Sequence, residues 1–302
     1  MPFWMRWILS LSPKFVVTGA NGFIGTALVR QLRARECRVI AIGRKAAKGL
    51  DRTIEDYGQL SRQPGERLIH LAQSNILDSF DDNARKLCDE AVQTTEKLAH
   101  KFGSAMVYVS SATVYGDQYS EPVDETATLA GTGIYCEMKM ACEEVVMAAN
   151  GCVVRLANTV GCGMSSATLP AEIAAQLKSE LSGDCSPIAV KRLDPERDWI
   201  DFRDAAAGLA SLAIEAVSGI YNLGSGRAVT ARRIVEIMSE LAGQASRPIT
   251  AATETATSTS PSYLCLNSSK IKATTRWKTE HSLEASLKNY LQCKGFVGVC
   301  AE

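Results

Sequence analysis

Short, continuous runs of branched and apolar residues recur through the first half of the chain, and stretches of a different periodicity separate them. Such runs are typical of strands that are buried on both faces of a parallel sheet. Between the runs, apolar residues recur three or four positions apart over 26–35 and 81–100, which predicts amphipathic helices. The predicted strands are KFVVTGA, CRVIAIG, RLIHLA, AMVYVSS and CVVRLAN.

This alternation of strands and helices predicts the class of fold. Parallel strands need crossover connections, and the connecting helices cover both faces of the sheet. We therefore expect an α/β fold over 14–158, namely a Rossmann-type, doubly wound parallel sheet. The second half is less regular, and we expect 159–302 to form mostly a smaller C-terminal α/β domain, with segments near 192–222 returning to the first domain. Its predicted elements are helices at 168–181, 230–242 and 282–291, a strand at 188–190 and a strand leading into a turn at 219–226.

Charge and composition exclude several classes of protein. The 302 residues include 33 Lys and Arg and 33 Asp and Glu, so the formal net charge is zero. Nucleic-acid binding normally needs a basic excess, and we expect no nucleic-acid partner. The three histidines are scattered and the ten cysteines form no C-x-x-C pair, so we expect no metal site.

The cysteines and the first residues also bear on where the chain works. We expect free thiols in a reducing cytoplasm, because a chain of this length can be stabilised by core burial without disulfides. Residues 1–12 are apolar but fall short of the roughly 20 residues that a membrane-spanning helix needs. They also leave no room for a signal-peptide cleavage site before the first strand. We interpret them as a packed extension or as the result of an upstream start codon, with Met5 as an alternative start.

A glycine-rich turn joins the first predicted strand to the first helix, where residues 18–25 read TGANGFIG. One glycine permits the tight turn, one lets the backbone approach a pyrophosphate, and one lets the helix pack closely on the strand. The start of the helix then presents free N–H groups to the phosphates. Because a strand precedes the turn and a helix follows it, the pattern predicts a dinucleotide site. Its cofactor-binding residues would be Gly19, Asn21, Gly22, Phe23, Ile24 and Gly25.

The end of the second predicted strand bears on the choice between NADP and NAD. A site that is specific for NAD usually has an acidic residue there, which binds the ribose 2′-hydroxyl. This chain has Arg44 and Lys45 instead. Two cations suit a 2′-phosphate, since a guanidinium can make paired, charge-assisted hydrogen bonds with it. We expect NADP as the cofactor, with NAD as the alternative.

A second pattern supplies candidate catalytic residues. Tyr135 and Lys139 are four positions apart in a predicted helix, so their side chains share one helix face. An ammonium beside a phenol favours the phenolate and lowers the phenol pKa from about 10, which would make Tyr135 a usable general acid or base. Ser111 ends the preceding strand at the edge of the sheet where ligands bind, and its hydroxyl could hold the reacting oxygen. Thr113 is the alternative to Ser111.

These motifs resemble those of a known superfamily. The spacing G-x-x-G-x-x-G is similar to that of the short-chain dehydrogenase/reductase superfamily, and TGANGFIG resembles its extended branch. That branch is the NAD-dependent epimerase/dehydratase family, which acts on nucleotide sugars. The resemblance extends from Lys14 to Leu291. Two motifs are most similar to those of particular enzymes in this family. YNLGSGRAV resembles a motif of GDP-4-keto-6-deoxy-D-mannose reductase, and SSATVYG resembles a motif of UDP-glucose 4-epimerase.

The resemblance implies a catalytic role for three residues and a cofactor role for four. Tyr135 and Lys139 would be the catalytic pair, and Ser111 would be the third catalytic residue. Tyr135 and Lys139 would also contact the cofactor, together with Leu71 and Ala72. The first domain, residues 14–158, would then be the dinucleotide-binding domain.

The resemblance also implies substrate contacts. In the run RLAN, Asn158 would contact the diphosphate of the nucleotide sugar, and in the stretch DPERDWIDFRD, Arg197 would hold that diphosphate. Thr113 would be a further substrate-binding residue, and residues 159–302 would mostly form the substrate-binding domain. Members of the family often dimerise through helices of the cofactor domain, so a homodimer is a further expectation.

Two reactions fit this pattern. The first is NADPH-dependent reduction of an NDP-4-keto-6-deoxyhexose at C4, which the two cations after the second strand favour. The alternative is a 4-epimerase that keeps NAD tightly bound, which SSATVYG favours. Dehydratases of the family have Asp-Glu where this chain has Ala112 and Thr113, and neutral residues cannot drive elimination of water. A non-catalytic dinucleotide-sensing scaffold is a third hypothesis, and the presence of both Tyr135 and Lys139 disfavours it.

Overall fold

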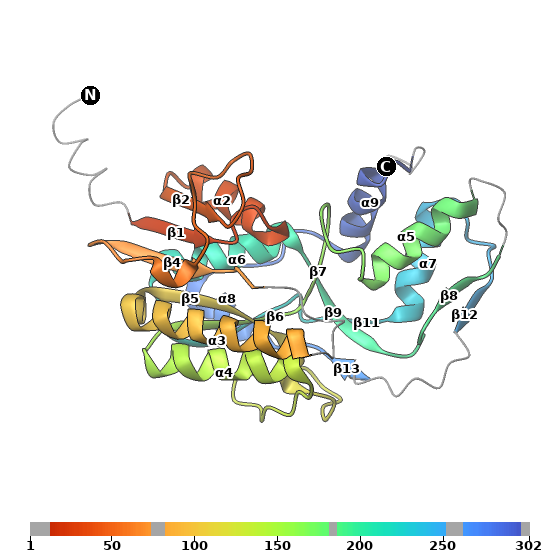
Figure 1. Cartoon of the computed structure of the whole chain (residues 1–302). Coiled ribbons are helices and arrows are strands. Elements are labelled where there is room, and N and C mark those ends of the chain that lie inside the picture. Colours follow the sequence, from red (N-terminus) through yellow and green to blue (C-terminus); the bar gives the residue numbers. More distant parts are fainter. Residues whose placement is uncertain (1–12, 74–81, 181–185, 252–261, 297–302) are drawn as a thin grey trace.

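A parallel sheet of seven strands forms the centre of the molecule, in the order β10-β6-β5-β4-β1-β2-β3 (Figure 1). The computed structural model describes residues 13–73, 82–180, 186–251 and 262–296. Each of the six strand pairings in this sheet is parallel, so the carboxyl ends of all seven strands lie at one edge. The strands are β1 (Lys14–Thr18), β2 (Arg38–Gly43), β3 (Arg52–Thr53), β4 (Glu66–His70), β5 (Met106–Ser111), β6 (Cys152–Leu156) and β10 (Gly219–Leu223).

Helices cover both faces of this sheet. Alternate residues of β1 point to opposite faces, so that Phe15 and Val17 pack in one apolar core and Val16 in another. The first core contains side chains of α2 (Phe23–Ala34) and α6 (Phe202–Glu215), and the second contains those of α3 and α4. The predicted α/β fold with a doubly wound parallel sheet is confirmed. The other elements around this sheet are α3 (Asp82–Phe102), α4 (Ile134–Ala148), α8 (Ser269–Thr275) and the single turns η1 (Tyr57–Gln59), η2 (Gly103–Ala105) and η3 (Ala112–Tyr115).

The remaining elements form a second group beside the carboxyl edge of the main sheet (Figure 1). In this group β9 pairs with β7, β11 and β13, and β8 pairs with β12. Three helices close over these strands around a third apolar core, which includes Trp199 of β9. The division into domains at 158 stays a prediction. The elements are β7 (Asn158–Val160), β8 (Ile188–Val190), β9 (Glu196–Asp201), β11 (Ala228–Thr230), β12 (Ile249–Ala251), β13 (Tyr263–Leu264), α5 (Leu169–Glu180), α7 (Ala231–Leu241) and α9 (Leu283–Cys293).

A disulfide joins the loop after β7 to the end of α9. Cys162 and Cys293 are bonded across a sequence separation of 131 residues, with their Cα atoms 6.0 Å apart. The expectation that the thiols are free was therefore wrong for this pair, because a contact between such distant residues leaves no local pattern. Six other described cysteines are free, and Cys185 and Cys300 lie outside the described residues.

The placement of the chain in the cytoplasm stays a prediction. Of the helices in the described part of the chain, none is both long and apolar enough to cross a membrane. The apolar residues 1–12, which the sequence analysis interprets as an extension or an upstream start, lie outside the described residues.

We expect the disulfide to stabilise the fold. It closes a loop of more than 100 residues, and a crosslink of this kind lowers the entropy of the unfolded chain, which is typically worth about 2–4 kcal/mol. Replacing both cysteines by serine should lower the free energy of unfolding in urea by that amount, and dithiothreitol should lower it equally in the wild type. The control is Cys37→Ser, which removes a free thiol. A wild type that is insensitive to dithiothreitol would contradict the prediction.

Candidate active site

The turn between β1 and α2 brings two stretches of backbone into close contact at the carboxyl edge of the sheet. Gly19 has a φ of +69°, a left-handed conformation that favours glycine. A Cβ atom at Gly25 would lie 2.1 Å from the carbonyl oxygen of Gly19, and one at Gly19 would lie 2.9 Å from the backbone nitrogen of Ala72. Both positions therefore require glycine.

The start of α2 is suited to an anion. Gly22 precedes the helix, and no side chain caps the free N–H groups of its first turn. Free N–H groups and the positive end of the helix dipole together attract phosphate. The turn thus fits the pyrophosphate of a dinucleotide, because no side chain caps the N–H groups that would face the phosphates.

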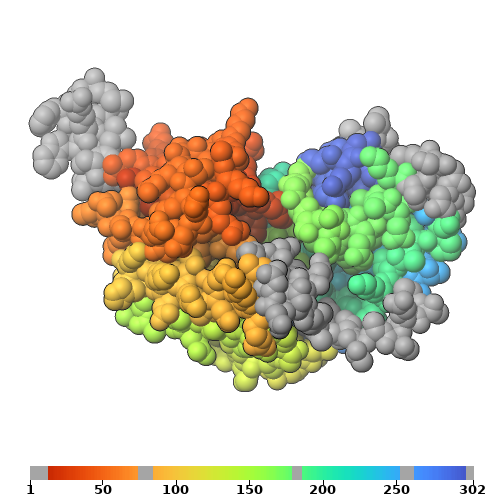
Figure 2. All heavy atoms as spheres, viewed as in Figure 1, coloured from red at the N-terminus to blue at the C-terminus, as the bar shows by residue number. Residues whose placement is uncertain are grey.

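A large cavity opens beside this turn. It measures about 790 Å³ and lies in the hollow between the red-to-orange part of the molecule and the green-to-blue part (Figure 2). All the predicted catalytic and substrate-binding residues line it, and so do most of the predicted cofactor-binding residues. These are Gly19, Gly22, Phe23, Ile24, Gly25, Leu71, Ser111, Thr113, Tyr135, Lys139, Asn158 and Arg197.

The candidate catalytic side chains come from two neighbouring elements. Ser111 ends β5, and its Oγ lies 2.9 Å from the Oγ1 of Thr113 in the turn η3. Tyr135 lies in the first turn of α4, and its phenol is hydrogen-bonded to Ser111. One turn later, the Nζ of Lys139 lies 5.7 Å from the centre of the Tyr135 ring and donates a hydrogen bond of 2.8 Å to the carbonyl oxygen of Val109. The hydroxyls and the ammonium therefore converge on one side of the cavity.

Burial changes the pKa values of the Tyr135 phenol and the Lys139 ammonium. It raises the pKa of Tyr135 to about 12, against a smaller opposing effect of the hydrogen bond with Ser111. The expectation that the ammonium brings this pKa below its usual value was wrong, because removal of the phenolate from water has the larger effect. Burial also lowers the pKa of Lys139 to about 8, although Cys142 and Glu143 act in the opposite direction. At neutral pH the site thus holds a neutral phenol beside an ammonium.

Cations gather at one end of the cavity. Arg197, on β9, lies there with Lys191 and Arg192, and burial lowers the pKa of Arg197 to about 10. Asn158 begins β7 and is exposed to the cavity. Arg155, at the start of the RLAN run, instead lies in the core. Three cations therefore line this end of the cavity, and one of them, Arg192, forms an ion pair of 2.7 Å with Asp194.

The buried guanidinium of Arg155 has a structural role. It forms an ion pair of 2.8 Å with Glu143 of α4, in which both side chains are almost fully buried. It also donates a hydrogen bond of 3.0 Å to the hydroxyl of Tyr115. These contacts tie α4 to β6 and η3, and so help to fix the helix that carries Tyr135.

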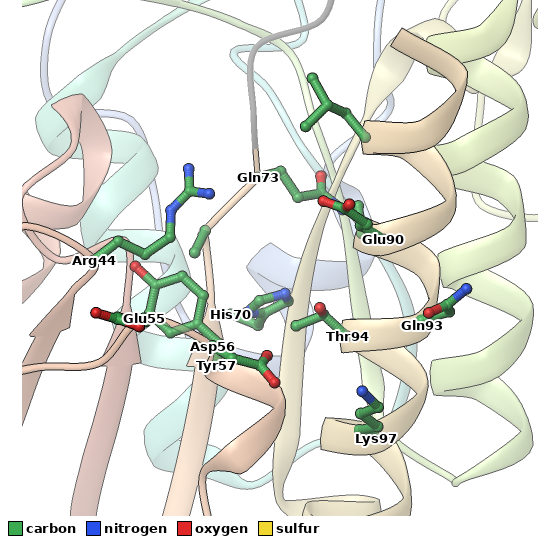
Figure 3. A pocket seen from close by; sticks show the side chains of 13 residues that line it. Arg44, Glu55, Asp56, Tyr57, His70, Gln73, Glu90, Gln93, Thr94 and Lys97 are labelled. Carbon is green, nitrogen blue, oxygen red and sulfur yellow. The ribbon is translucent and has the colours of Figure 1, made fainter. Parts of the chain in front are cut away.

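A smaller cavity of about 300 Å³ lies next to the large one. Arg44 and Tyr57 form one side, and side chains of α3 form the other (Figure 3). Two predicted cofactor-binding residues, Arg44 and Ala72, line this cavity, whereas Asn21 and Lys45 line neither of the two. The cofactor-binding residues predicted from the sequence therefore divide between two adjoining cavities.

Several residues of these cavities were not predicted from the sequence. Gln73 lines both of them, Tyr57 lines the smaller one, and Lys191 and Arg192 line the larger one. Gln73 follows shortly after β4 at the carboxyl edge of the sheet, and this position was a usable signal because ligands bind at that edge. Tyr57 and the two cations lie in short or irregular segments, where the sequence offers no comparable signal.

Comparisons with known proteins agree with this geometry. The model of the NAD dependent epimerase/dehydratase family matches residues 15–224. The dTDP-6-deoxy-L-talose 4-dehydrogenase (NAD(P)(+)) of Kitasatospora kifunensis is 27% identical over 255 residues, which cover 76% of this chain and 79% of that protein.

Solved structures of similar fold include complexes with either dinucleotide. MoeE5 in complex with UDP-glucuronic acid and NAD superposes with a TM-score of 0.79 at 21% identity, over 93% of this chain and 99% of that one. RMD from Pseudomonas aeruginosa, complexed with NADPH, has a TM-score of 0.76 at 21% identity, over 93% and 98% of the two chains. These likenesses concern the fold, whereas the family model covers most of the chain. The chain belongs to the NAD dependent epimerase/dehydratase family.

Proposed function

We propose that the chain is an NADPH-dependent reductase that acts on C4 of an NDP-4-keto-6-deoxyhexose. The observation that carries this proposal is the convergence of Ser111, Tyr135 and Lys139 on one large cavity beside the glycine turn. The Kitasatospora kifunensis relative supports the choice of carbon and of sugar class, because it is named as a 4-dehydrogenase of a dTDP-6-deoxy sugar. A 4-dehydrogenase and a C4 reductase carry out one type of reaction in opposite directions.

The side chains of the cavity suit the reduction of a ketone. The bound dinucleotide would supply the hydride. Tyr135, which is neutral below a pKa of about 12, would donate its phenolic proton to the sugar oxygen. Ser111 would donate a hydrogen bond to the same oxygen and hold the carbonyl against Tyr135. Lys139 would place a positive charge beside the phenolate that this proton transfer leaves.

The opposite end of the cavity suits a diphosphate. Arg197 and its neighbouring cations would bind the diphosphate of the nucleotide sugar, with Asn158 as a further contact and Thr113 nearer the sugar. Among the described residues that line this cavity, Glu172 is the one carboxylate. Elimination of water needs acidic groups beside the catalytic serine, and Ala112 and Thr113 do not supply them. A dehydratase is therefore disfavoured.

Arg44 supports NADPH over NADH. It is exposed at the end of β2 and lines the smaller cavity, where the adenosine half of a dinucleotide would extend from the glycine turn. A guanidinium there would pair with a 2′-phosphate, which NADH lacks. Lys45 follows it, is exposed, and would add positive charge without lining the cavity.

Two other functions remain as alternatives. A 4-epimerase with tightly bound NAD is favoured by SSATVYG, which contributes Ser111 and Thr113 to the cavity. A non-catalytic dinucleotide-sensing scaffold would use the same fold, since fold does not determine function. The expected homodimer also stays a prediction.

We expect Arg44→Ala to weaken NADPH binding selectively. Loss of a charge-assisted contact with the 2′-phosphate should raise the dissociation constant for NADPH by about 10-fold or more, and leave that for NADH nearly unchanged. Fluorescence titration of the reduced dinucleotides measures both constants. The matched control is Arg52→Ala, which removes an exposed cation on the next strand. Equal weakening of both dinucleotides would contradict the role of Arg44.

We expect the reductive reaction to slow as the pH rises through about 8. Lys139 loses its charge there, whereas Tyr135 remains protonated up to a pKa of about 12. The value of kcat/KM should therefore be constant below pH 8 and fall above it. A pH series with NADPH and the keto sugar measures this. If kcat/KM instead increases between about pH 6 and pH 8, a deprotonated base controls the reaction and the prediction is contradicted.

The first experiment for the reaction is to denature the purified protein and identify any dinucleotide that it releases. Stoichiometric NAD would contradict the reductase and indicate the epimerase. Release of NADP(H), or an empty protein that binds NADPH better than NADH, supports the reductase. Binding of neither dinucleotide would contradict both enzymes and favour a non-catalytic protein built on the same fold.

The second experiment supplies NADPH and an NDP-4-keto-6-deoxyhexose and follows the loss of reduced nicotinamide. We expect a 4-hydroxy sugar as the product, and we expect Tyr135→Phe to lower kcat by roughly 100-fold or more, as is usual for loss of a general acid. Tyr119→Phe is the control, because Tyr119 lies outside both cavities and bonds the backbone of Thr128. A Tyr135→Phe variant with full activity would contradict the mechanism.

A further inference from the structure

Gln73 lies between the two cavities and makes contacts that fix the orientation of its amide. Its Oε1 accepts a hydrogen bond from the Nζ of Lys139. Its Nε2 donates a hydrogen bond of 2.7 Å to the hydroxyl of Tyr108 and lies 3.7 Å from the Sγ of Cys142. A reversed amide would direct its NH₂ group at an ammonium, which has donors only. The oxygen of Gln73 is therefore held toward Lys139.

Lys139 is a buried cation with few acceptors around it. An ammonium has three N–H donors. In the described part of the chain, two of them are accounted for by the carbonyl oxygen of Val109 and the Oε1 of Gln73. The third N–H donor is left to point toward a ligand in the large cavity, which Lys139 lines. Because the lysine side chain is long and flexible, it needs fixed acceptors to keep this direction.

We propose that Gln73 is a positioning residue for Lys139. Its amide oxygen holds the ammonium beside Tyr135 and directs the remaining N–H into the large cavity, and Tyr108 holds the amide in turn. This inference rests on the proposed function, which assigns Lys139 to the reaction. In this proposal Gln73 neither donates nor accepts the proton that is transferred, and it acts through its hydrogen bond with Lys139.

Two of the groups around Lys139 stay neutral near pH 8, where Lys139 titrates. His70, at the end of β4, is buried, and its pKa is lowered to about 3, first by burial and then by the charge of Lys139. Burial raises the pKa of Tyr108 on β5 well above its usual value, so this phenol stays neutral. Among the described residues, the titratable and charged groups that face Lys139 are His70, Tyr108, Tyr135, Cys142 and Glu143, and the last of these is paired with Arg155.

Two substitutions of Gln73 should move the titration of Lys139 in opposite directions. Gln73→Leu removes an acceptor that stabilises the ammonium, so the neutral amine is favoured and the pKa of Lys139 falls. Gln73→Glu places a negative charge beside the ammonium, so the charged form is favoured and the pKa rises. A residue with a merely structural role would not produce shifts of opposite sign.

The experiment titrates Lys139 directly in the full chain. Lysine labelled with ¹³C at Cε is incorporated, and the Cε signal that is missing in Lys139→Met is followed against pH. The midpoint should fall in Gln73→Leu and rise in Gln73→Glu, each by roughly one pH unit. Gln59→Leu and Gln59→Glu are the controls, because Gln59 is exposed in η1 and lines neither cavity. An unchanged midpoint, or a shift of the same sign in both Gln73 variants, overturns the inference.

Kinetics separate this inference from the proposed function. For Gln73→Leu we expect kcat to fall by roughly 10-fold with little change in the KM of the keto sugar, and the alkaline limb of the rate profile should follow the titration midpoint in each variant. If Gln73→Leu does not fold, the direction in which the Lys139 midpoint shifts in Gln73→Glu still tests the inference. Opposite midpoint shifts without any ketone reduction by the wild type would support the positioning of Lys139 and contradict the reductase.

Discussion

The turn that follows β1 and the start of α2 approach each other more closely than any side chain would permit. The Cβ position of Gly25 lies 2.1 Å from the carbonyl oxygen of Gly19, so the helix can come this close only without a side chain there. This contact sets the direction of α2, and with it the direction of the free N–H groups at its first turn. Tyr135 and Lys139 reach the same cavity from α4 on the other face of the sheet. The position of the glycine turn and of the first turn of α2 relative to these candidate catalytic side chains thus depends on one glycine contact.

Burial has a larger effect than charge attraction on the chemistry of this site. The phenol and the ammonium lie one helical turn apart, yet the pKa of each is displaced toward its neutral form. The ammonium is held by two neutral acceptors, a backbone carbonyl and the amide of Gln73. The nearby carboxylate of Glu143 forms an ion pair with Arg155 instead. A site built in this way keeps an acid protonated at neutral pH. In the proposed function, that acid would be the proton donor for the ketone oxygen.

Much of the fold could be predicted because its signals are local. The strand runs and the Gly-rich turn are readable within a few residues, and the helix after Tyr135 lies within one residue of its expected start. The helix α6 was missed because apolar residues occupy nearly all of its sides, which removes the amphipathic pattern. The strand β9 was missed because ERDWID is mostly charged, and its pairing with three other strands depends on distant segments.

The candidate site could be predicted to a similar extent and for the same reason. Motifs of fixed spacing placed twelve residues that the fold brings to one cavity, although the sequence could not show that Asn21 and Lys45 lie away from both. The pKa of Tyr135 was expected in the wrong direction, because spacing reveals a neighbouring charge but not the depth of burial. Gln73 belongs to no motif, and only its position shortly after β4 could have indicated that it lines the site.

The bond between Cys162 and Cys293 has a consequence for the covalent topology of the chain. The ring that it closes contains β9 and β10, so it includes strands of both the main sheet and the second sheet. A single break in the backbone anywhere inside this ring opens it without releasing a fragment. The two pieces of a nicked molecule would stay covalently linked until a reductant was added, and β10 could stay in the sheet although the chain leading to it had been cut.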